Sequence, residues 1–245
     1  MSQLAMVIDL NRCVGCHACA IACRAEWSVP VPYKRNWVKS AGPEKTPKGM
    51  AFTFYPGLCN HCDEPKCTTV CPADPEEREF KSKDGKVKKI EIRATYKDPF
   101  TGAVLIDKSR CIGCGACVEA CPYGARYLNE ELDDPKADKC TFCTERLEHG
   151  LEPACVRTCI SGARIFGDLS DKNSSVSKLI KDKGAIRLVS EKVNIGPNVY
   201  YIGKEKDLYL LKKKFAPTER TWENVMAPVR RNILISAFKS LKVTV

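Results

Sequence analysis

The sequence predicts an α+β protein made of one cysteine-rich module that occurs twice, with inserted loops or a hairpin and a helical C-terminal extension. Two observations carry this prediction. The sixteen cysteines of the 245-residue chain fall into four groups of four, and the first and third groups share one spacing while the second and fourth share another. Short apolar segments that fit strands flank the groups, and the short gaps before each fourth cysteine fit about one helical turn.

The strands expected in this fold lie next to the cysteine groups. Apolar triplets stand before the first and third groups, and Gly-Ala-Arg follows the third and fourth groups. Each triplet is typical of a strand that enters a loop, and each Gly-Ala-Arg begins a strand that leaves one. The expected strands are 7–9, 105–107, 127–128 and 165–166.

Two insertions interrupt the groups. Residues 24–58 hold two tryptophans and several prolines, which predicts a loop that wraps the core or faces a partner. Residues 73–104 alternate between apolar and polar from Val87 to Ile92 and then reach the turn sequence 98–102, which predicts a hairpin.

After the last cysteine, the pattern predicts helices and one more pair of strands. Ser174 or Ser175 is expected to cap a helix that ends near Gly184, and 186–189 is expected to pair with 199–202. Residues 206–245 are expected to form a helical extension that docks on a partner, with packing on this chain's own core as the alternative. Two prolines break this extension and an apolar stripe lines its last helix: Pro217, Pro228, Val229, Ile233, Ala237 and Leu241.

The cysteines are the candidate ligand residues, and their spacing limits what they bind. Disulfides are disfavoured because cysteines three residues apart are poor partners and the chain is larger than scaffolds that depend on disulfides. A structural zinc site takes two Cys-x2-Cys pairs, whereas the first and third groups run Cys-x2-Cys-x2-Cys-x3-Cys. In bacterial ferredoxins that run binds one 4Fe–4S cluster with three thiolates and reaches a second cluster with the fourth. The four groups are Cys13, Cys16, Cys19 and Cys23; Cys59, Cys62, Cys67 and Cys71; Cys111, Cys114, Cys117 and Cys121; and Cys140, Cys143, Cys155 and Cys159.

The loops around these cysteines suit a 4Fe–4S core. Cysteines at i, i+3 and i+6 of a tight loop reach three iron corners of the cube. Gly15, Gly113 and Gly115 lie inside such loops, where a missing side chain lets backbone N–H groups approach the sulfides. The second and third groups end in Cys-Pro, as in bacterial ferredoxins, whereas Cys23 and Cys159 are followed by other residues. The sequence therefore predicts iron–sulfur clusters.

The charge balance changes once clusters are counted. The chain has 40 Lys plus Arg against 30 Asp plus Glu, a formal net charge of +10. A 4Fe–4S core held by four thiolates contributes about −2, so four of them bring the loaded protein near about +2. The basic surplus is therefore expected to offset cluster charge, which argues against nucleic-acid binding. A zinc protein that binds nucleic acid is the remote alternative.

Four side chains near the groups have two interpretations each. Arg126 and Arg164 are expected either to raise the potential of a cluster or to be solvated strand residues. His61 and His149 are expected to be turn or surface residues rather than residues that tune a cluster.

Several other function classes lack their motifs. No phosphate-binding loop, dinucleotide fingerprint or nucleophile elbow occurs, so substrate chemistry is expected on another chain. No run approaches the roughly 18 to 20 apolar residues that cross a bilayer. Residues 1–10 lack a basic start and a cleavage site. The chain is therefore expected to have no transmembrane segment and no secretory signal of its own.

The residues around the cysteines resemble one family. Residues 59–67 read CNHCDEPKC, residues 139–143 read KCTFC, and residues 153–155 read PAC. These stretches are similar to the four-cluster, ferredoxin-like iron–sulfur (beta) subunit of the molybdopterin oxidoreductases of the dimethyl sulfoxide reductase type. The resemblance covers residues 1 to about 205. It implies four 4Fe–4S clusters, because Cys114 stands where some relatives have Trp and a 3Fe–4S centre. Ile160 stands where the family has proline, which removes no ligand.

The resemblance also implies which cysteines share a cluster, a question that spacing leaves open between a tandem and a nested pairing. The family's pairing is nested, and its clusters form a wire from the catalytic subunit toward the membrane partner. In wire order the implied ligand sets are Cys13, Cys16, Cys19 and Cys159; Cys23, Cys140, Cys143 and Cys155; Cys59, Cys62, Cys67 and Cys121; and Cys71, Cys111, Cys114 and Cys117. The implied domains are an outer module of residues 1–58 and 122–205, an inner module of residues 59–121 and the extension 206–245.

In function, the resemblance implies a non-catalytic electron-transfer subunit with no catalytic residue of its own. It would relay electrons between a molybdopterin (Mo or W) catalytic subunit and a membrane quinone-reactive or cytochrome subunit. The implied location is a peripheral, membrane-associated complex of anaerobic respiration. The periplasmic side is favoured, by co-export with the catalytic subunit, and the cytoplasmic side is the alternative. A hydrogenase subunit or a free polyferredoxin carrier is the alternative function.

Overall fold

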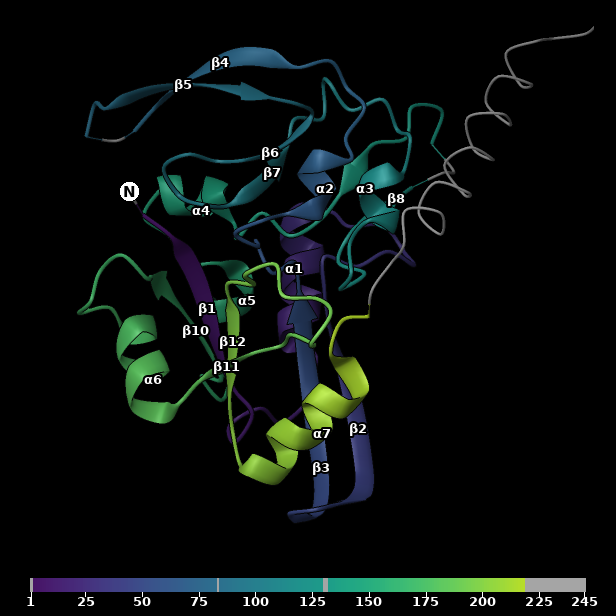
Figure 1. Cartoon of the computed structure of the whole chain (residues 1–245), viewed down its shortest axis with the longest axis vertical. Helices are drawn as coiled ribbons and strands as arrows, with labels where there is room; N and C mark the ends of the chain where they lie inside the picture. The colour runs from purple at the N-terminus through teal and green to yellow at the C-terminus, as the bar shows by residue number, and fades with distance from the viewer. Residues whose placement is uncertain (1, 83, 130–131, 219–245) are drawn as a thin grey trace, which may run out of the picture.

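The computed structural model describes residues 2–82, 84–129 and 132–218. Within these ranges the chain forms a mixed helix and strand fold with one four-stranded sheet and four two-stranded sheets (Figure 1). No helix in the described ranges is long and apolar enough to span a membrane. The predicted apolar stripe from Val229 to Leu241 lies outside the described residues.

The four-stranded sheet has the order β10-β1-β12-β11. The central strand β1 (Leu4–Asp9) pairs antiparallel with β10 (Arg164–Asp168) and parallel with β12 (Val199–Ile202). On its other side β12 pairs antiparallel with β11 (Ile186–Arg187). Residues 5–8 of β1 are fully buried because the strand is central and covered on both faces. This pairing places the loop that follows β1 beside the segment that precedes β10, although the two are far apart in sequence.

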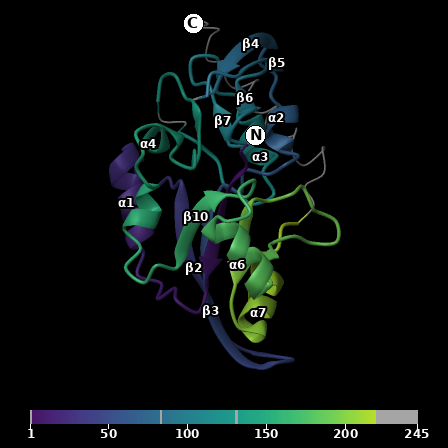
Figure 2. The ribbon, with the colours of Figure 1, turned by 90° about the vertical axis from the view of Figure 1, so that its left-hand side faces the viewer.

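One face of the sheet is covered by α6 (Ser175–Lys183), which packs on β1 and β10 (Figures 1 and 2). The Ser174 hydroxyl accepts a hydrogen bond from the N–H of Ser177, which caps the helix. The helix ends at Gly184, whose φ of 59° favours glycine. Both predicted caps of this helix are confirmed, as is the strand pair that follows it.

Residues 24–58 are mostly regular structure, so the predicted loop is wrong there. Strands β2 (Asn36–Thr46) and β3 (Gly49–Leu58) form a long antiparallel ribbon, which Figure 1 shows reaching away from the four-stranded sheet. Trp37 is buried and meets the ring of Tyr55 edge-on, with ring centroids 6.2 Å apart.

Two helices lie against this ribbon. The first, α1 (Ala18–Trp27), packs on β2, and α7 (Glu205–Phe215) lies along both strands (Figure 1). Leu210 and Leu211 of α7 are completely buried. Phe215 stacks on a ribbon tyrosine with ring centroids 4.5 Å apart. The start of the C-terminal extension therefore packs on this chain's own ribbon.

Residues 73–104 lead into two hairpins where one was predicted. Strand β4 (Glu76–Lys81) pairs with β5 (Val87–Ile92), and β6 (Thr95–Lys97) pairs with β7 (Val104–Ile106). The predicted turn joins β6 to β7, where the Asp98 carboxylate accepts hydrogen bonds from two turn N–H groups. The alternating strand β5 pairs backward with β4 and not across that turn. The turn was predicted correctly and its partner strand was not.

The remaining elements are short and carry cysteines or link them. Three one-turn helices each hold a cysteine, at Cys67, Cys117 and Cys155. These helices suit the short gaps that the sequence predicts for helical turns. The short elements are α2 (Lys66–Thr69), α3 (Ala116–Glu119), β8 (Tyr127–Leu128), β9 (Ala137–Asp138), α4 (Thr144–Glu148) and α5 (Ala154–Arg157).

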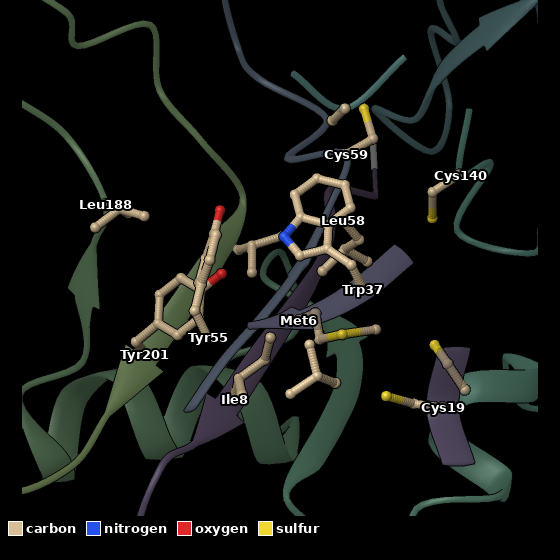
Figure 3. Close-up of a cluster of buried hydrophobic side chains, with 14 of the residues drawn as sticks. Met6, Ile8, Cys19, Trp37, Tyr55, Leu58, Cys59, Cys140, Leu188 and Tyr201 are labelled. Carbon is tan, nitrogen blue, oxygen red and sulfur yellow. The ribbon is translucent and has the colours of Figure 1, made fainter. Parts of the chain in front are cut away.

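The main apolar core lies between the four-stranded sheet and the ribbon (Figure 3). Met6 and Ile8 of β1 belong to the same buried cluster as Trp37 and Leu58 of the ribbon. The same cluster contains several cysteines, among them Cys19, Cys59 and Cys140. The apolar core thus continues directly into the cysteine-bearing loops and keeps water away from them.

Candidate metal centres

Two sets of four cysteines each line a cavity at the surface. In the first set, three residues of the loop after β1 and the start of α1 meet the last cysteine of the chain around a space of about 330 Å³, open solvent at its mouth included. The fourth set surrounds a similar space of about 340 Å³. The first set is Cys13, Cys16, Cys19 and Cys159, and the fourth set is Cys71, Cys111, Cys114 and Cys117.

The other eight cysteines form two buried sets, which their mutual electrostatic effects reveal. Burial and then the neighbouring thiols Cys155 and Cys143 raise the pKa of Cys23 to about 12. Burial and then Cys59, Cys121 and Cys67 raise the pKa of Cys62 above its usual range. The second set is Cys23, Cys140, Cys143 and Cys155, and the third set is Cys59, Cys62, Cys67 and Cys121.

Each set neighbours the next in the order first, second, third and fourth, and we call this succession the row. Cys155 of the second set is near Cys19 of the first, and Cys140 of the second is near Cys59 of the third. Arg126 touches the third set and the fourth together. All eight cysteines of the second and third sets are buried, whereas the first and fourth sets include exposed or half-buried cysteines. The row therefore has an insulated middle and two ends near solvent.

All sixteen cysteines lie within the described ranges, and none forms a disulfide. Across the described ranges, no group of three or more His, Cys, Asp or Glu side chains is set to hold a single metal ion. Four thiolates around one zinc would lie roughly 3.8 Å apart, from a Zn–S bond of about 2.3 Å and tetrahedral geometry. A polynuclear core holds its ligands farther apart, so this donor set fits such a core better than one zinc ion.

Two glycines explain how the loops close around the sets. Gly15 has a φ of 67°, and a Cβ there would stand 2.3 Å from the ring of Phe54. Gly113 has a φ of 70°, and a Cβ there would stand 2.4 Å from the carbonyl oxygen of Pro135. The left-handed backbone conformation and the lack of space both disfavour a side chain at these two positions.

The repeated Gly-Ala-Arg has a local explanation. In each copy the alanine N–H donates to the sulfur of the cysteine four residues earlier: Ala125 to Cys121 at 3.4 Å and Ala163 to Cys159 at 3.2 Å. Burial opposes the thiolate of Cys159, but the N–H groups that point at it hold its pKa below the usual value. Such donors stabilise negative charge on sulfur, which is what cluster ligation requires.

The arginine of each copy is buried, so the interpretation as a solvated strand residue is wrong. Arg126 is 5 % exposed and donates from Nη2 to the sulfur of Cys67 and to Thr95 Oγ1, both at 2.9 Å. Arg164 is 3 % exposed, with Nη1 4.0 Å from the sulfur of Cys155. Arg126 Nε and Nη1 and Arg164 Nη2 have no hydrogen-bond partner among the described residues. A buried guanidinium needs a counter-charge, and a thiolate-bound 4Fe–4S core carries about −2. The residues therefore fit that group.

His61 is not a surface histidine. It is fully buried and stacks on Phe142 with ring centroids 3.7 Å apart. Its Nδ1 accepts the N–H of Val104 at 2.9 Å. Burial, and then the nearby charges of Lys139 and Arg126, hold its pKa well below the usual value, so the ring is neutral. His149 is exposed, as predicted.

Two buried features had no signal in the sequence. Lys139 is 1 % exposed, and its Nζ donates to the carbonyls of Val104 and of Cys140. Arg35 forms a buried bidentate ion pair with Asp138, at 2.8 and 2.9 Å. Lysine and arginine are normally exposed, so residue type alone places both at the surface.

Comparison with known proteins gives a consistent result. Two models described as "4Fe-4S dicluster domain" match residues 6–74 and residues 50–169. The chain is 38% identical to the B subunit of tetrathionate reductase from Salmonella typhimurium over 203 residues, which covers 82% of this chain and 72% of that protein. It is 35% identical to the B subunit of sulfite dehydrogenase from Allochromatium vinosum over 251 residues, covering 91% of this chain and 92% of that protein. It is 34% identical to the B polypeptide of polysulfide reductase from Wolinella succinogenes over 203 residues, covering 82% of this chain and 94% of that protein.

Proposed function

This protein belongs to the family of 4Fe–4S iron–sulfur subunits of the molybdopterin oxidoreductases, and from this premise we propose that it carries four 4Fe–4S clusters as an electron wire. It relays electrons between a Mo or W pterin catalytic subunit and a membrane quinone-reactive or cytochrome subunit. The observation that carries this proposal is the single row of four cysteine sets, buried in the middle and open at both ends.

In this proposal each cysteine set holds one cluster. The row order supports the nested pairing over a tandem one, because the first set joins Cys13 to Cys159 and the third joins Cys59 to Cys121. The outer and inner modules belong to the same proposal, as does a docking role for the part of the extension 206–245 that follows α7. The position of a cluster along the row determines its role. The clusters of the two end sets, which lie near solvent, receive and deliver electrons, and those of the buried middle sets pass the electrons on.

A bound 4Fe–4S cluster supplies one-electron redox chemistry at nearly constant geometry. This chain's own residues position and insulate it. The buried sets exclude water, the N–H groups of Ala125 and Ala163 stabilise charge on sulfur, and the glycine loops allow close approach of the backbone. The tight loops and one-turn helices around the cysteines favour fast outer-sphere transfer, because rigid ligands need little reorganisation.

The membrane partner and the side of the membrane are further parts of the proposal. An iron–sulfur subunit whose two end sets include exposed or half-buried cysteines is suited to two different partners, one at each end. If the folded chain crosses the membrane together with an exported catalytic subunit, the complex attaches peripherally to the periplasmic side of the membrane. Attachment on the cytoplasmic side is the alternative.

The test is anaerobic purification with metal analysis and EPR. About sixteen irons per chain, four reducible 4Fe–4S signals and a copurifying large chain with Mo or W are expected. A 3Fe–4S signal of one per chain as isolated would contradict the cluster content. A large partner without Mo or W would favour the hydrogenase alternative, and no partner at all would favour a free carrier. Zinc in place of iron would refute the proposal.

A further inference from the structure

We propose that three buried cations, Arg164, Lys139 and Arg126, occupy the three gaps of the row, one between each neighbouring pair of cysteine sets, and raise the potentials of the clusters beside them. They are positioning residues for electron transfer, since they act through clusters that they do not ligate. The inference rests on the proposed function, because it requires a cluster in each set.

Arg164 occupies the gap between the first and second sets. Its guanidinium lies against Cys155 of the second set, 4.0 Å from the sulfur. Its charge also acts on Cys19 and Cys13 of the first set and on Cys23 of the second. An arginine stays charged at any pH at which proteins fold, so this gap holds a permanent positive charge.

Arg126 occupies the equivalent gap in the other half of the chain. Its Nη2 donates to Cys67 of the third set at 2.9 Å. Its charge acts on Cys59 and Cys121 of the third set and on Cys117 of the fourth. Thr95 Oγ1 accepts a second hydrogen bond from the same Nη2 and fixes the guanidinium in place.

Lys139 occupies the middle gap, which joins the two halves. Its Nζ donates to the carbonyl of Cys140 in the second set at 2.8 Å and to the carbonyl of Val104. Burial lowers the pKa of Lys139, and the nearby Cys59 and Cys67 of the third set oppose that shift and favour its charged form. Within the described part of the chain its Nζ is hydrogen-bonded to these two carbonyls and to no sulfur, so it acts across space on both neighbouring sets.

The physical consequence follows from the sign of the charge. A cluster becomes more negative by one when it accepts an electron, and a fixed buried cation stabilises that form more than the oxidised form. Because each arginine faces two sets, it is expected to raise two potentials together and to leave the distant pair unchanged. A purely structural arginine would change stability without this selectivity.

The experiment is an EPR-monitored redox titration of the full, cluster-loaded chain. Dithionite is the electron source, each cluster accepts one electron, and no ligand bond breaks. We expect Arg164→Gln to make the clusters of the first and second sets at least tenfold harder to reduce, which is 59 mV or more for one electron. We expect Arg126→Gln to do the same for the third and fourth sets. The Arg→Lys variant at each site should keep most of the reduction potential of the unmodified chain, because lysine keeps the positive charge.

Controls separate this inference from its premise. Lys178→Gln removes one positive charge from the exposed face of α6 and should leave all four potentials unchanged. Four clusters with potentials that do not move in the Gln variants would overturn the inference and leave the electron wire intact. Fewer than four clusters in the unmodified chain would instead overturn the proposed function. If an arginine variant loses iron, Lys139→Met tests the inference at the middle gap instead. Potentials that shift only for the clusters of the second and third sets would support the inference, and unchanged potentials would refute it.

Discussion

The buried ion pair between Arg35 and Asp138 offers a sharp test of how the clusters act on their surroundings. It ties the start of β2 to β9, 103 residues away, through two hydrogen bonds of 2.8 and 2.9 Å. Both side chains are at least nine-tenths buried. The Tyr127 hydroxyl also donates to Asp138, at 2.5 Å, and the half-exposed Lys108 lies 3.5 Å away.

Arg35 and Asp138 differ in the opposite charges that remain beside each of them when its partner is replaced. Burial opposes the charge of Arg35, while Asp138 and then Cys140 and Cys23 raise its pKa. Under the proposed function those two cysteines ligate one negatively charged cluster, so Arg35 would keep a counter-charge when Asp138 is neutralised. Among the described residues, Asp138 keeps the Lys108 ammonium and the Tyr127 hydroxyl when Arg35 is removed.

We therefore expect the two substitutions to lower the free energy of unfolding by unequal amounts. Arg35→Met should lower the free energy of unfolding by about 3–5 kcal/mol, the usual penalty for an uncompensated buried charge. Asp138→Asn should lower it by only about 1.5 kcal/mol, the value of a hydrogen bond to a charged group. The measurement is anaerobic urea unfolding of the loaded protein, followed by visible absorption and circular dichroism.

Two comparisons complete this test. Lys48→Met breaks the exposed ion pair with Glu205 and should leave the urea midpoint unchanged. Iron removal should abolish the difference between Arg35→Met and Asp138→Asn, because it removes the counter-charge. Equal costs in the loaded protein would refute the argument that the second cysteine set supplies that charge.

Three further predictions concern the extension, the row and cluster loading. Leu211→Ala should lower the free energy of unfolding by about 2–5 kcal/mol, because the side chain is completely buried against the ribbon. Truncation after Pro217 should keep all the iron and abolish partner binding in a pull-down. Full partner binding by the truncated chain would contradict a docking role for the tail. Cys16→Ser should alter only the EPR signal of one end of the row and Cys114→Trp only that of the other; an unchanged spectrum for Cys114→Trp would refute the nested ligand sets. Burial raises the pKa of thiols such as Cys23, to about 12, so loading releases protons and iron should dissociate faster as the pH falls from about 8 to about 6, as an iron-release assay would show.

The cysteine spacing predicted the kind of site but not which cysteines belong to the same set. Cys13, Cys16 and Cys19 lie close together in sequence, so the loop after β1 and the start of α1 fix their positions. Their neighbour Cys159 is set by the pairing of β1 with β10, a contact between residues about 160 positions apart. Spacing carries no information on such long-range pairing, which is why the nested order rested on resemblance alone.

The ribbon shows why the insertion at 24–58 was mispredicted. Prolines are rare in central strands because each lacks a ladder N–H, and their presence favoured a loop. A two-stranded ribbon has only edge strands, so Pro56 is tolerated opposite Val38 in the ladder. Tertiary packing then supplies the order: Trp37 and Tyr55 are buried beneath α7 and the sheet, partners that the local sequence does not reveal.

The sequence predicts that the basic surplus behind the formal charge of +10 offsets cluster charge. The structure places three of these cations in the core. Arg126, Arg164 and Lys139 are each at most 5 % exposed and stand among cysteines, so their charge acts within the core and not at the surface. A buried cation costs several kcal/mol unless a counter-charge stays beside it. The same three residues are therefore a reason for the chain to fold around its clusters and a means to set their potentials, and loss of the clusters should destabilise the regions around these gaps first.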